Sequence, residues 1–411
     1  MTFVRSTTLP PSALRLLAAA PHRLLFFIGA SNVLLAMGWW TFWLIAARWG
    51  VPRLPQPSMP AGWMHAIVMQ YHVLPSFIFG FLLTVFPRWM NLPPLTPRHY
   101  VPVGLGLLGG QALTLLGLAG SMTLLEAGAL LTIGGWLVGT LILGRQVYLD
   151  RGRTWHAVSC LSALAFGLLG LVFYCISLFR FDAQAMYAAI KLGATAMLLP
   201  LYFSVCHRMI PFFAGAVLPQ YRLVRPLWVL VAVWLLALVH TWLELRHGYA
   251  WLWIVDAPLA AIFGGLLYAW RPPTRHVPPL LAVLFVGFAW LPVAFALYAG
   301  QSAWYQLTDV FVLGRAPAHA LFVGFFGSLL VAMVTRVTQG HSGRPLVLGR
   351  VAGFAFVLVQ LTAIMRIAAE ALPDAPAWQA LAGICWIVAF LPWVLRSGWI
   401  YLTPRVDGAK G

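Results

Sequence analysis

The residues Arg315-Ala-Pro-Ala-His319-Ala-Leu-Phe-Val-Gly324 begin an apolar run that continues to Met333-Val334-Thr335-Arg336. The segment Gly340-His341-Ser342-Gly343-Arg344-Pro345-Leu346 follows directly. The apolar run is long enough to cross a bilayer as one helix, with a histidine just inside one end and an arginine closing the other. Ionisable side chains at such positions cost free energy in lipid, so they indicate a functional site.

Composition places the whole chain in the membrane. Of its 411 residues, 62% are hydrophobic and only 9% are charged, whereas a soluble domain carries about 25% charged residues. The formal net charge of +17 does not indicate a nucleic-acid partner, because the Lys and Arg residues stand singly between apolar segments. The partner that this composition predicts is the lipid bilayer.

Apolar segments of membrane length recur along the chain and predict an all-α polytopic bundle of about twelve transmembrane helices. We expect a cytoplasmic tail at 1–22, one transmembrane domain over 23–402 and a second tail at 403–411. The predicted helices are 23–48, 62–87, 100–119, 122–145, 156–179, 185–208, 226–243, 249–270, 278–299, 316–336, 350–371 and 378–402. Gly106-x-x-x-Gly110 and Gly135-x-x-x-Gly139 predict close helix contacts.

The distribution of basic residues predicts the orientation. Of the 26 Lys and Arg residues, 19 fall on the side that holds both termini, 6 fall on the opposite side and Lys191 lies within a helix. Cytoplasmic loops carry the excess of basic residues, so we expect both termini in the cytoplasm. The four cysteines lie inside predicted helices and do not indicate a disulfide framework.

Three histidines inside predicted helices are candidate haem ligands. His65 and His72 lie seven residues apart, which is nearly two turns of an α-helix and about 10 Å along its axis, so we expect both on one face with Met69 between them. His319 lies on another helix at a depth similar to that of His65. Two imidazoles from separate helices can hold a haem iron from both sides. We predict His65 and His319 as ligands and His72 as an alternative or second-site ligand; hydrogen bonds to main-chain carbonyls would be the structural alternative.

A second polar site is predicted at the cytoplasmic ends of two helices. Cys206-His207-Arg208 ends the sixth helix, and Arg336 and the Gly340–Pro345 turn end the tenth. Arginines pair with carboxylates and small anions through two parallel N–H donors. We therefore consider His207, His341, Arg208 and Arg344 as a second site for metal or anion, although arginines at inner helix ends also follow from topology alone.

The remaining ionisable residues have simpler interpretations. Lys191 is expected to extend its ammonium group towards the membrane surface. His240, Glu244 and His247 cluster at one helix end, where they could bind copper or be polar loop residues. Four further histidines at inner helix ends are interpreted as solvated: His22, His99, His156 and His276.

The quoted motifs resemble those of the NnrS family over essentially the whole chain. The strongest is His319-Ala-Leu followed by Gly324, Gly327, Met333-x-Thr-Arg336 and Gly340–Leu346. Three weaker motifs occur in the family's order: Pro21-His-Arg-Leu-Leu-Phe-Phe27, Trp63-x-His65-Ala66 with Gly80–Trp89, and Arg208-x-Ile-Pro-Phe-Phe213. One departure concerns the second helix, where the family's Trp-His-Ala-His-Glu-Met has its second His and Glu replaced here by Ile67 and Val68, while His72 is new.

The resemblance implies a bacterial inner-membrane protein containing haem, here expected to be of b type, and copper, associated with denitrification and tolerance of nitric oxide. Haem–copper oxidases offer a looser analogy, with twelve helices and a haem held between helices two and ten. Their paired histidines on helix seven and His-x-His on helix ten are absent here.

From these expectations we derive three functional hypotheses. The first is a membrane haem protein that binds, detoxifies or reduces nitric oxide or protects metal centres from it, with an electron donor from the respiratory chain. The second is a haem or metal transporter, since Pro75 and Pro200 interrupt two helices near mid-membrane. The third is an assembly partner of a respiratory enzyme.

Overall fold

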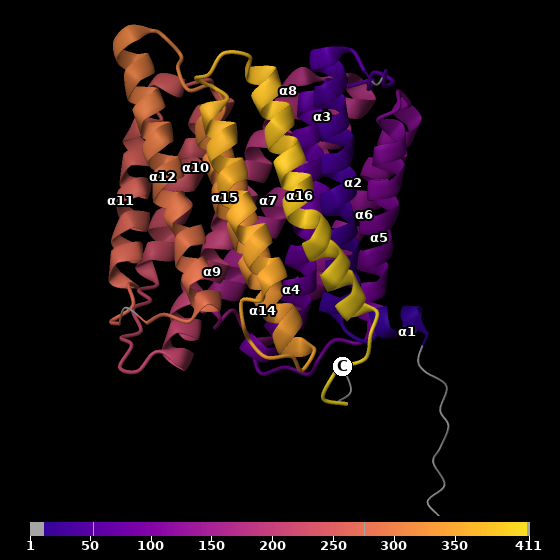
Figure 1. Cartoon of the computed structure of the whole chain (residues 1–411), viewed down its shortest axis with the longest axis vertical. Coiled ribbons are helices and arrows are strands. Elements are labelled where there is room, and N and C mark those ends of the chain that lie inside the picture. Colours follow the sequence, from indigo (N-terminus) through magenta and orange to yellow (C-terminus); the bar gives the residue numbers. More distant parts are fainter. Residues whose placement is uncertain (1–11, 52, 275, 409–411) are drawn as a thin grey trace, which may run out of the picture.

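The computed structural model describes residues 12–51, 53–274 and 276–408, and this part of the chain contains helices and loops but no strand. The all-α prediction is therefore confirmed (Figure 1). Eleven helical segments in the described part are long and apolar enough to cross a membrane, and Trp253–Ala269 is a shorter apolar helix. Together they correspond one to one with the twelve predicted spans. Residues 1–11 and 409–411 of the predicted tails lie outside the described residues.

The spans keep to the predicted segments, with shifts of a few residues at most ends. A short helix, α1 (Ala13–Leu17), precedes the first span. The spans are α2 (Pro21–Trp49); α3 (Ala61–Val68), η1 (Met69–Val73) and α4 (Leu74–Trp89); α5 (Pro97–Gly117); α6 (Met122–Leu149); α7 (Trp155–Arg180); α8 (Ala183–Lys191), η2 (Leu192–Leu198) and α9 (Leu199–Val217); α10 (Trp228–Leu245); α11 (Trp253–Ala269), preceded by η3 (Tyr249–Trp251); α12 (Pro279–Thr308); α13 (Ala316–His319), η4 (Ala320–Gly327) and α14 (Ser328–His341); α15 (Arg350–Ala368); and α16 (Ala375–Tyr401).

Both ends of the described chain lie at the same end of the bundle, as an even number of spans requires (Figure 1). We call this the inner end, because the arginine bias predicts that it faces the cytoplasm. The tenth span extends beyond the predicted boundary at Arg336 and ends at His341. Gly340 and His341 therefore belong to the helix, and the turn proper begins at Ser342.

Three spans form the centre of the bundle. Within their most apolar windows, 83% of the residues of Ala61–Trp89, Ala183–Val217 and Ala316–His341 are buried, against 56% or less for the other candidate spans. These are the second, sixth and tenth spans of the chain, so a central helix recurs at every fourth span. Threefold repetition of a four-helix unit would produce this order, and it agrees with the predicted oxidase-like arrangement.

Each central span contains a π-helical segment: η1, η2 and η4. Pro75 and Pro200 stand at the second position of the α-helix that follows η1 and η2. A proline ring would clash with the carbonyl four residues earlier in a regular α-helix, and the wider i→i+5 turn relieves that clash. Because His72 lies within η1, the 100° step used to predict a face shared with His65 does not hold for all the residues between them.

Close contacts between small residues hold the peripheral helices together, as predicted. A Cβ placed on Gly106 would lie 2.6 Å from the Cα of Gly135, and one on Gly139 would lie 2.6 Å from the Phe79 ring. Only glycine allows the backbones of α5 and α6 to approach so closely. The four cysteines are free, which agrees with the predicted lack of a disulfide framework.

Candidate functional site

His319 lies at the outer end of the tenth span with its ring held in a defined orientation. Its Nδ1 lies 2.9 Å from the carbonyl oxygen of Arg315, one helical turn earlier. A carbonyl oxygen only accepts, so Nδ1 carries the proton and Nε2 keeps its lone pair. Metal-binding histidines generally donate the second ring N–H in this way, which fixes tautomer and orientation.

Arg366 of α15 covers the face of the His319 ring. Its Nη2 lies 3.2 Å from Nε2 and 3.4 Å from Nδ1 of His319. A donor nearly equidistant from both ring nitrogens lies over the ring, not along the in-plane lone pair of Nε2. The same Nη2 also contacts Oε1 of Glu370 at 3.4 Å, and Nη1 of Arg366 is buried without a hydrogen-bond partner among the described residues. An unpaired buried donor of this kind calls for an explanation.

His65 lies near this pair, as predicted. Nη1 of Arg315 lies 3.8 Å from the Cβ position of Gly62, three residues before His65, and the carbonyl of the same arginine is hydrogen-bonded to His319. The His65 ring stacks on Trp40 of α2, with centroids 4.4 Å apart and an interplanar angle of 9°. Stacking occupies the faces of the ring and leaves its in-plane nitrogens clear of Trp40. The structure thus groups two imidazoles and two guanidiniums at the outer ends of α3, α13 and α15.

His72 lies deeper, in η1, and is fully buried. Neither ring nitrogen has a hydrogen-bond partner among the described residues, and each unsatisfied polar atom costs about 1–3 kcal/mol. Asn32 of α2 and Gln111 of α5 also contain buried side-chain atoms without a partner in this part of the chain. Of the three predicted haem ligands, His72 is the one whose two ring nitrogens are both buried and unpaired within the described residues.

The residues of the second predicted site contact different neighbours, and no contact between its members joins them into one cluster within the described residues. Nδ1 of His207 lies 3.0 Å from Nε2 of His156, whereas the His341 ring lies 4.4 Å from that of His22. Arg208 covers Trp89. Arg336 covers the Phe213 ring at 3.9 Å, and Arg344 lies over Trp399.

Two histidines interpreted as solvated are in fact buried: His22 is 5% exposed and His156 is 3% exposed. That interpretation was wrong because helix packing continues to the inner end, where each of the two rings contacts a second imidazole. His99 forms a capping box with Thr96 at the start of α5, and His276 is exposed.

A buried ionic network joins α8, α10 and α11 in the outer half of the bundle. Nζ of Lys191 lies 2.5 Å from Oε1 of Glu244. His240 contacts Glu244 at 3.4 Å and Asp256 at 2.6 Å. His240, Glu244 and Asp256 are all at most 3% exposed. His240 and Glu244 are therefore not polar loop residues, whereas His247 is exposed, and Lys191 is ion-paired.

Asp256 and Arg366 were missed as site residues. Asp256 stands alone among apolar residues in the predicted helix 249–270, and Arg366 stands inside 350–371. A single ionisable residue within a membrane-length apolar run is itself the signal that could have identified both. No group of three or more His, Cys, Asp or Glu residues in the described parts of the chain is arranged to hold a metal ion.

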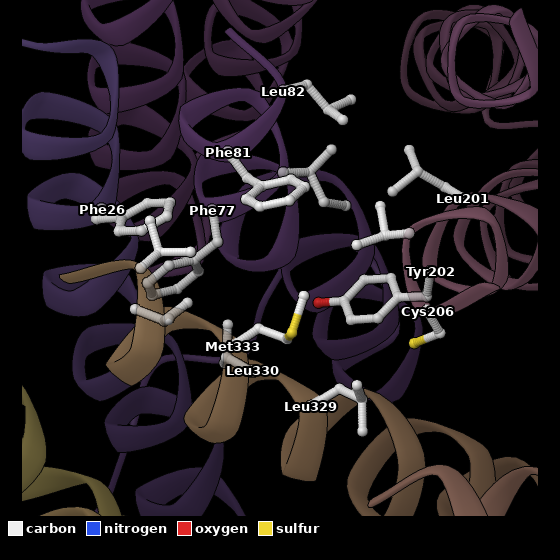
Figure 2. Close-up of a pocket in the computed structure, with 14 residues that line it drawn as sticks. Phe26, Phe77, Phe81, Leu82, Leu201, Tyr202, Cys206, Leu329, Leu330 and Met333 are labelled. Carbon is white, nitrogen blue, oxygen red and sulfur yellow. The ribbon is translucent and has the colours of Figure 1, made fainter. Parts of the chain in front are cut away.

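An apolar cavity of about 60 Å³ lies between the inner halves of the central spans and α2. Figure 2 shows its wall of phenylalanine and leucine side chains, with the Tyr202 hydroxyl directed towards the sulfur of Met333. Phe77, in the wall, is twelve residues from His65, or about 18 Å along a helix. The cavity is therefore separate from the outer imidazole cluster.

The fold and these clusters define a multi-pass, all-helical membrane protein whose central spans carry buried imidazole and guanidinium groups. The sequence profile of the family described as NnrS protein matches residues 16–405, nearly the whole chain. The chain therefore belongs to the NnrS family, as its motifs indicated. No curated protein matches the sequence significantly.

Proposed function

We propose that this protein is a membrane haem protein that binds nitric oxide, with His65 and His319 as the haem ligands at the outer end of the bundle. Membership of the NnrS family supports a role in the response to nitric oxide. The geometry supports the ligand assignment, because two imidazoles from different spans lie near each other beside two arginines.

The observation that carries the proposal is the hydrogen bond from His319 to the Arg315 carbonyl. It presents Nε2 of His319 as an unprotonated ligand atom in a fixed direction. Nη2 of Arg366 lies 3.2 Å from Nε2 but over the ring, so the in-plane lone pair of Nε2 is the one that would bind a haem iron. The Trp40 ring supports His65 by stacking, which leaves the in-plane nitrogens of His65 available as well.

The arginines fit the acidic groups of a haem. Propionate carboxylates accept charge-assisted hydrogen bonds from guanidinium groups. The buried Nη1 of Arg366 has no partner within the described residues, and a propionate oxygen would supply one. Arg315 approaches α3 at Gly62 and would act as a second donor.

A haem held by His65 and His319 would supply an iron that binds nitric oxide. With both imidazoles holding the haem, one of them would have to leave for the gas to bind. His65 is the candidate, because within the described residues its ring is held by stacking alone, whereas the His319 ring is hydrogen-bonded to the backbone. His72, buried and unpaired in the same span, would serve as a substitute ligand or as a proton acceptor.

Nitric oxide is small and apolar enough to arrive through lipid, and the cavity in Figure 2 provides apolar space within the membrane.

Copper fits less well than haem, because the described residues contain no group of three His, Cys, Asp or Glu side chains arranged to hold a metal ion. A transporter is not favoured, because the second and sixth spans run continuously through η1 and η2 instead of breaking at Pro75 and Pro200.

The test is an absorption spectrum of the purified protein, expressed with haem supplementation, before and after addition of nitric oxide. We expect a Soret band that shifts with nitric oxide, and we expect His319→Ala and His65→Ala to lose most of the haem. His276→Ala, which changes an exposed histidine, is the matched control and should retain it. A folded wild-type protein without haem, or full haem content in both variants, would contradict the proposal.

A further inference from the structure

A second cavity, of about 240 Å³, lies at the inner end of the bundle between α14, α15 and α16. It is separate from the haem site proposed above, which lies at the outer end. Its polar lining consists of Arg344, Arg396, Gln339, Thr335, Thr338 and Ser397. None of the described residues that line it is acidic, so two positive charges face the cavity without a carboxylate in its wall.

Arg344 has donor capacity that the protein does not use. Its Nη1 is buried and has no hydrogen-bond partner among the described residues, and its guanidinium lies 5.3 Å from the Trp399 ring centroid. Burial, and then the positive charge of Arg396, lower the pKa of Arg344 from its ordinary value. An anion between the two guanidiniums would supply the missing acceptor and offset this repulsion.

The loop that presents Arg344 is held in place from three directions. The side-chain amide of Gln339 donates to the carbonyl of Val347 at 2.8 Å and accepts from its N–H at 3.2 Å. The N–H of Val406 donates to the carbonyl of Ser342. Gly343 adopts a φ of 72°, a left-handed conformation that favours glycine. The turn that marks the family motif is thus a rigid frame around this cavity.

The wall also offers a hydroxyl donor and an apolar side. Thr335 accepts a hydrogen bond from the Trp393 indole at 3.0 Å, which leaves its hydroxyl proton free to donate. Trp393 and Ile400 make part of the wall apolar. Basic pockets between helices at the cytoplasmic side commonly receive phosphate head groups.

We propose that this cavity is a binding site for a phosphate-type oxyanion, held by Arg344 and Arg396. The two sources of that chemistry are the head group of an anionic phospholipid in the cytoplasmic leaflet and soluble phosphate. Guanidinium groups pair with phosphate oxygens in bidentate fashion, and the apolar part of the wall, Trp393 and Ile400, would contact the glycerol end of a lipid.

The experiment measures the thermal midpoint of the delipidated protein in an uncharged detergent. Inorganic phosphate is titrated in one arm and phosphatidylglycerol micelles in the other, each against sodium chloride at equal ionic strength. Arg344→Gln/Arg396→Gln is compared with Arg350→Gln, which removes an exposed arginine that does not line the cavity. Arg396→Gln alone is included, because Arg396 is exposed and its loss spares the loop.

We expect wild type and Arg350→Gln to be stabilised, with the apparent affinity reduced about tenfold or more in both Arg396 variants. Stabilisation by both ligands would identify a general phosphate site, and stabilisation by phosphatidylglycerol alone would identify a lipid site. Equal affinity in wild type and the double variant, or no response to either ligand, would overturn the proposal. The response to phosphate and phosphatidylglycerol does not depend on haem, so it would be the same if the proposed haem site proved wrong.

Discussion

His240 and Asp256 lie 2.6 Å apart, and both are fully buried between α10 and α11. With Glu244 and Lys191 they form a continuous chain of contacts across three helices. If His240 is protonated, the network holds two positive and two negative charges and is neutral as a whole. Buried ions are tolerated when their charges balance in this way, because an unpaired charge in a medium of low dielectric constant costs several kcal/mol.

The first prediction concerns this balance. Asp256→Asn keeps the shape of the side chain but removes one negative charge, so His240 loses the nearer of its two anionic partners and the network is no longer neutral. Breaking a buried pair by removing one partner costs about 3–5 kcal/mol, and we expect a clear fall in the thermal midpoint of the detergent-solubilised protein. Asp309→Asn, at an exposed helix end, is the control and should leave the midpoint unchanged. Similar midpoints for both variants would show that the pair contributes little.

The second prediction concerns Lys191 and Glu244. A double-mutant cycle with Lys191→Met and Glu244→Gln should show a favourable coupling of about 0.5–3 kcal/mol, the range found for residues in direct contact. The reason is that Lys191→Met leaves Glu244 with His240 as its remaining cationic partner. The measurement is the free energy of unfolding in detergent for all four proteins. Additive effects would mean that the lysine interacts mainly with solvent or lipid.

The third prediction concerns the packing of η4. A Cβ on Gly324 would lie 2.5–2.7 Å from indole atoms of Trp290. Trp290 cannot move easily, because its N–H donates to Gln360, which in turn donates to Ser328. We expect Gly324→Ala to destabilise the protein by about 1–3 kcal/mol. Gly264→Ala is the matched control, since nothing lies within 4 Å of its Cβ position, and it should be neutral or slightly stabilising. Equal thermal stability of the two variants would contradict this account.

The fold could be predicted because each span is specified by its own residues. Apolar length, prolines between helices and the arginine bias are local signals, and the structure keeps all twelve segments. These local signals do not specify which spans lie at the centre of the bundle. The sixth span is only moderately apolar, and its central position follows from its packing against other helices.

The candidate site was predictable in part. His65 and His319 were selected by their depth in separate helices, and the structure places them near each other.

The pairing of His156 with His207, and of His240 with Asp256, depends on contacts between different helices that no local pattern specifies. The relation between His65 and His72 could not be read from a regular helix, because η1 changes the helical step before His72, and only Pro75 indicated that change.

The fourth prediction concerns pH and the loop before α16. Hydrogen bonds from Arg48 hold the pKa of Asp374 below its ordinary value. A carboxyl with a lowered pKa in the folded state contributes stability above its unfolded pKa, and this contribution is lost as pH falls through the folded pKa. Asp374→Asn suits the test, because asparagine tolerates the left-handed conformation at this position and can still cap α16. We expect wild type to have the higher thermal midpoint near neutral pH, and the difference to disappear in acid. A difference independent of pH would exclude the charge as its cause.

The fifth prediction tests whether Arg366 acts on the proposed haem site through its charge. Its guanidinium covers His319 and is paired with Glu370, so Arg366→Gln both removes a positive charge and leaves a negative one unpaired. A positive charge beside a haem favours the reduced state, and we expect its loss to lower the reduction potential by about 60 mV, a tenfold change in a one-electron equilibrium. Arg366→Lys should restore most of the potential, because it restores the charge. Arg246→Gln, an exposed arginine at the same end of the bundle, should leave the potential unchanged. Redox titration of the Soret band measures all four proteins, and a potential that Arg366→Gln leaves unchanged would place the haem away from His319.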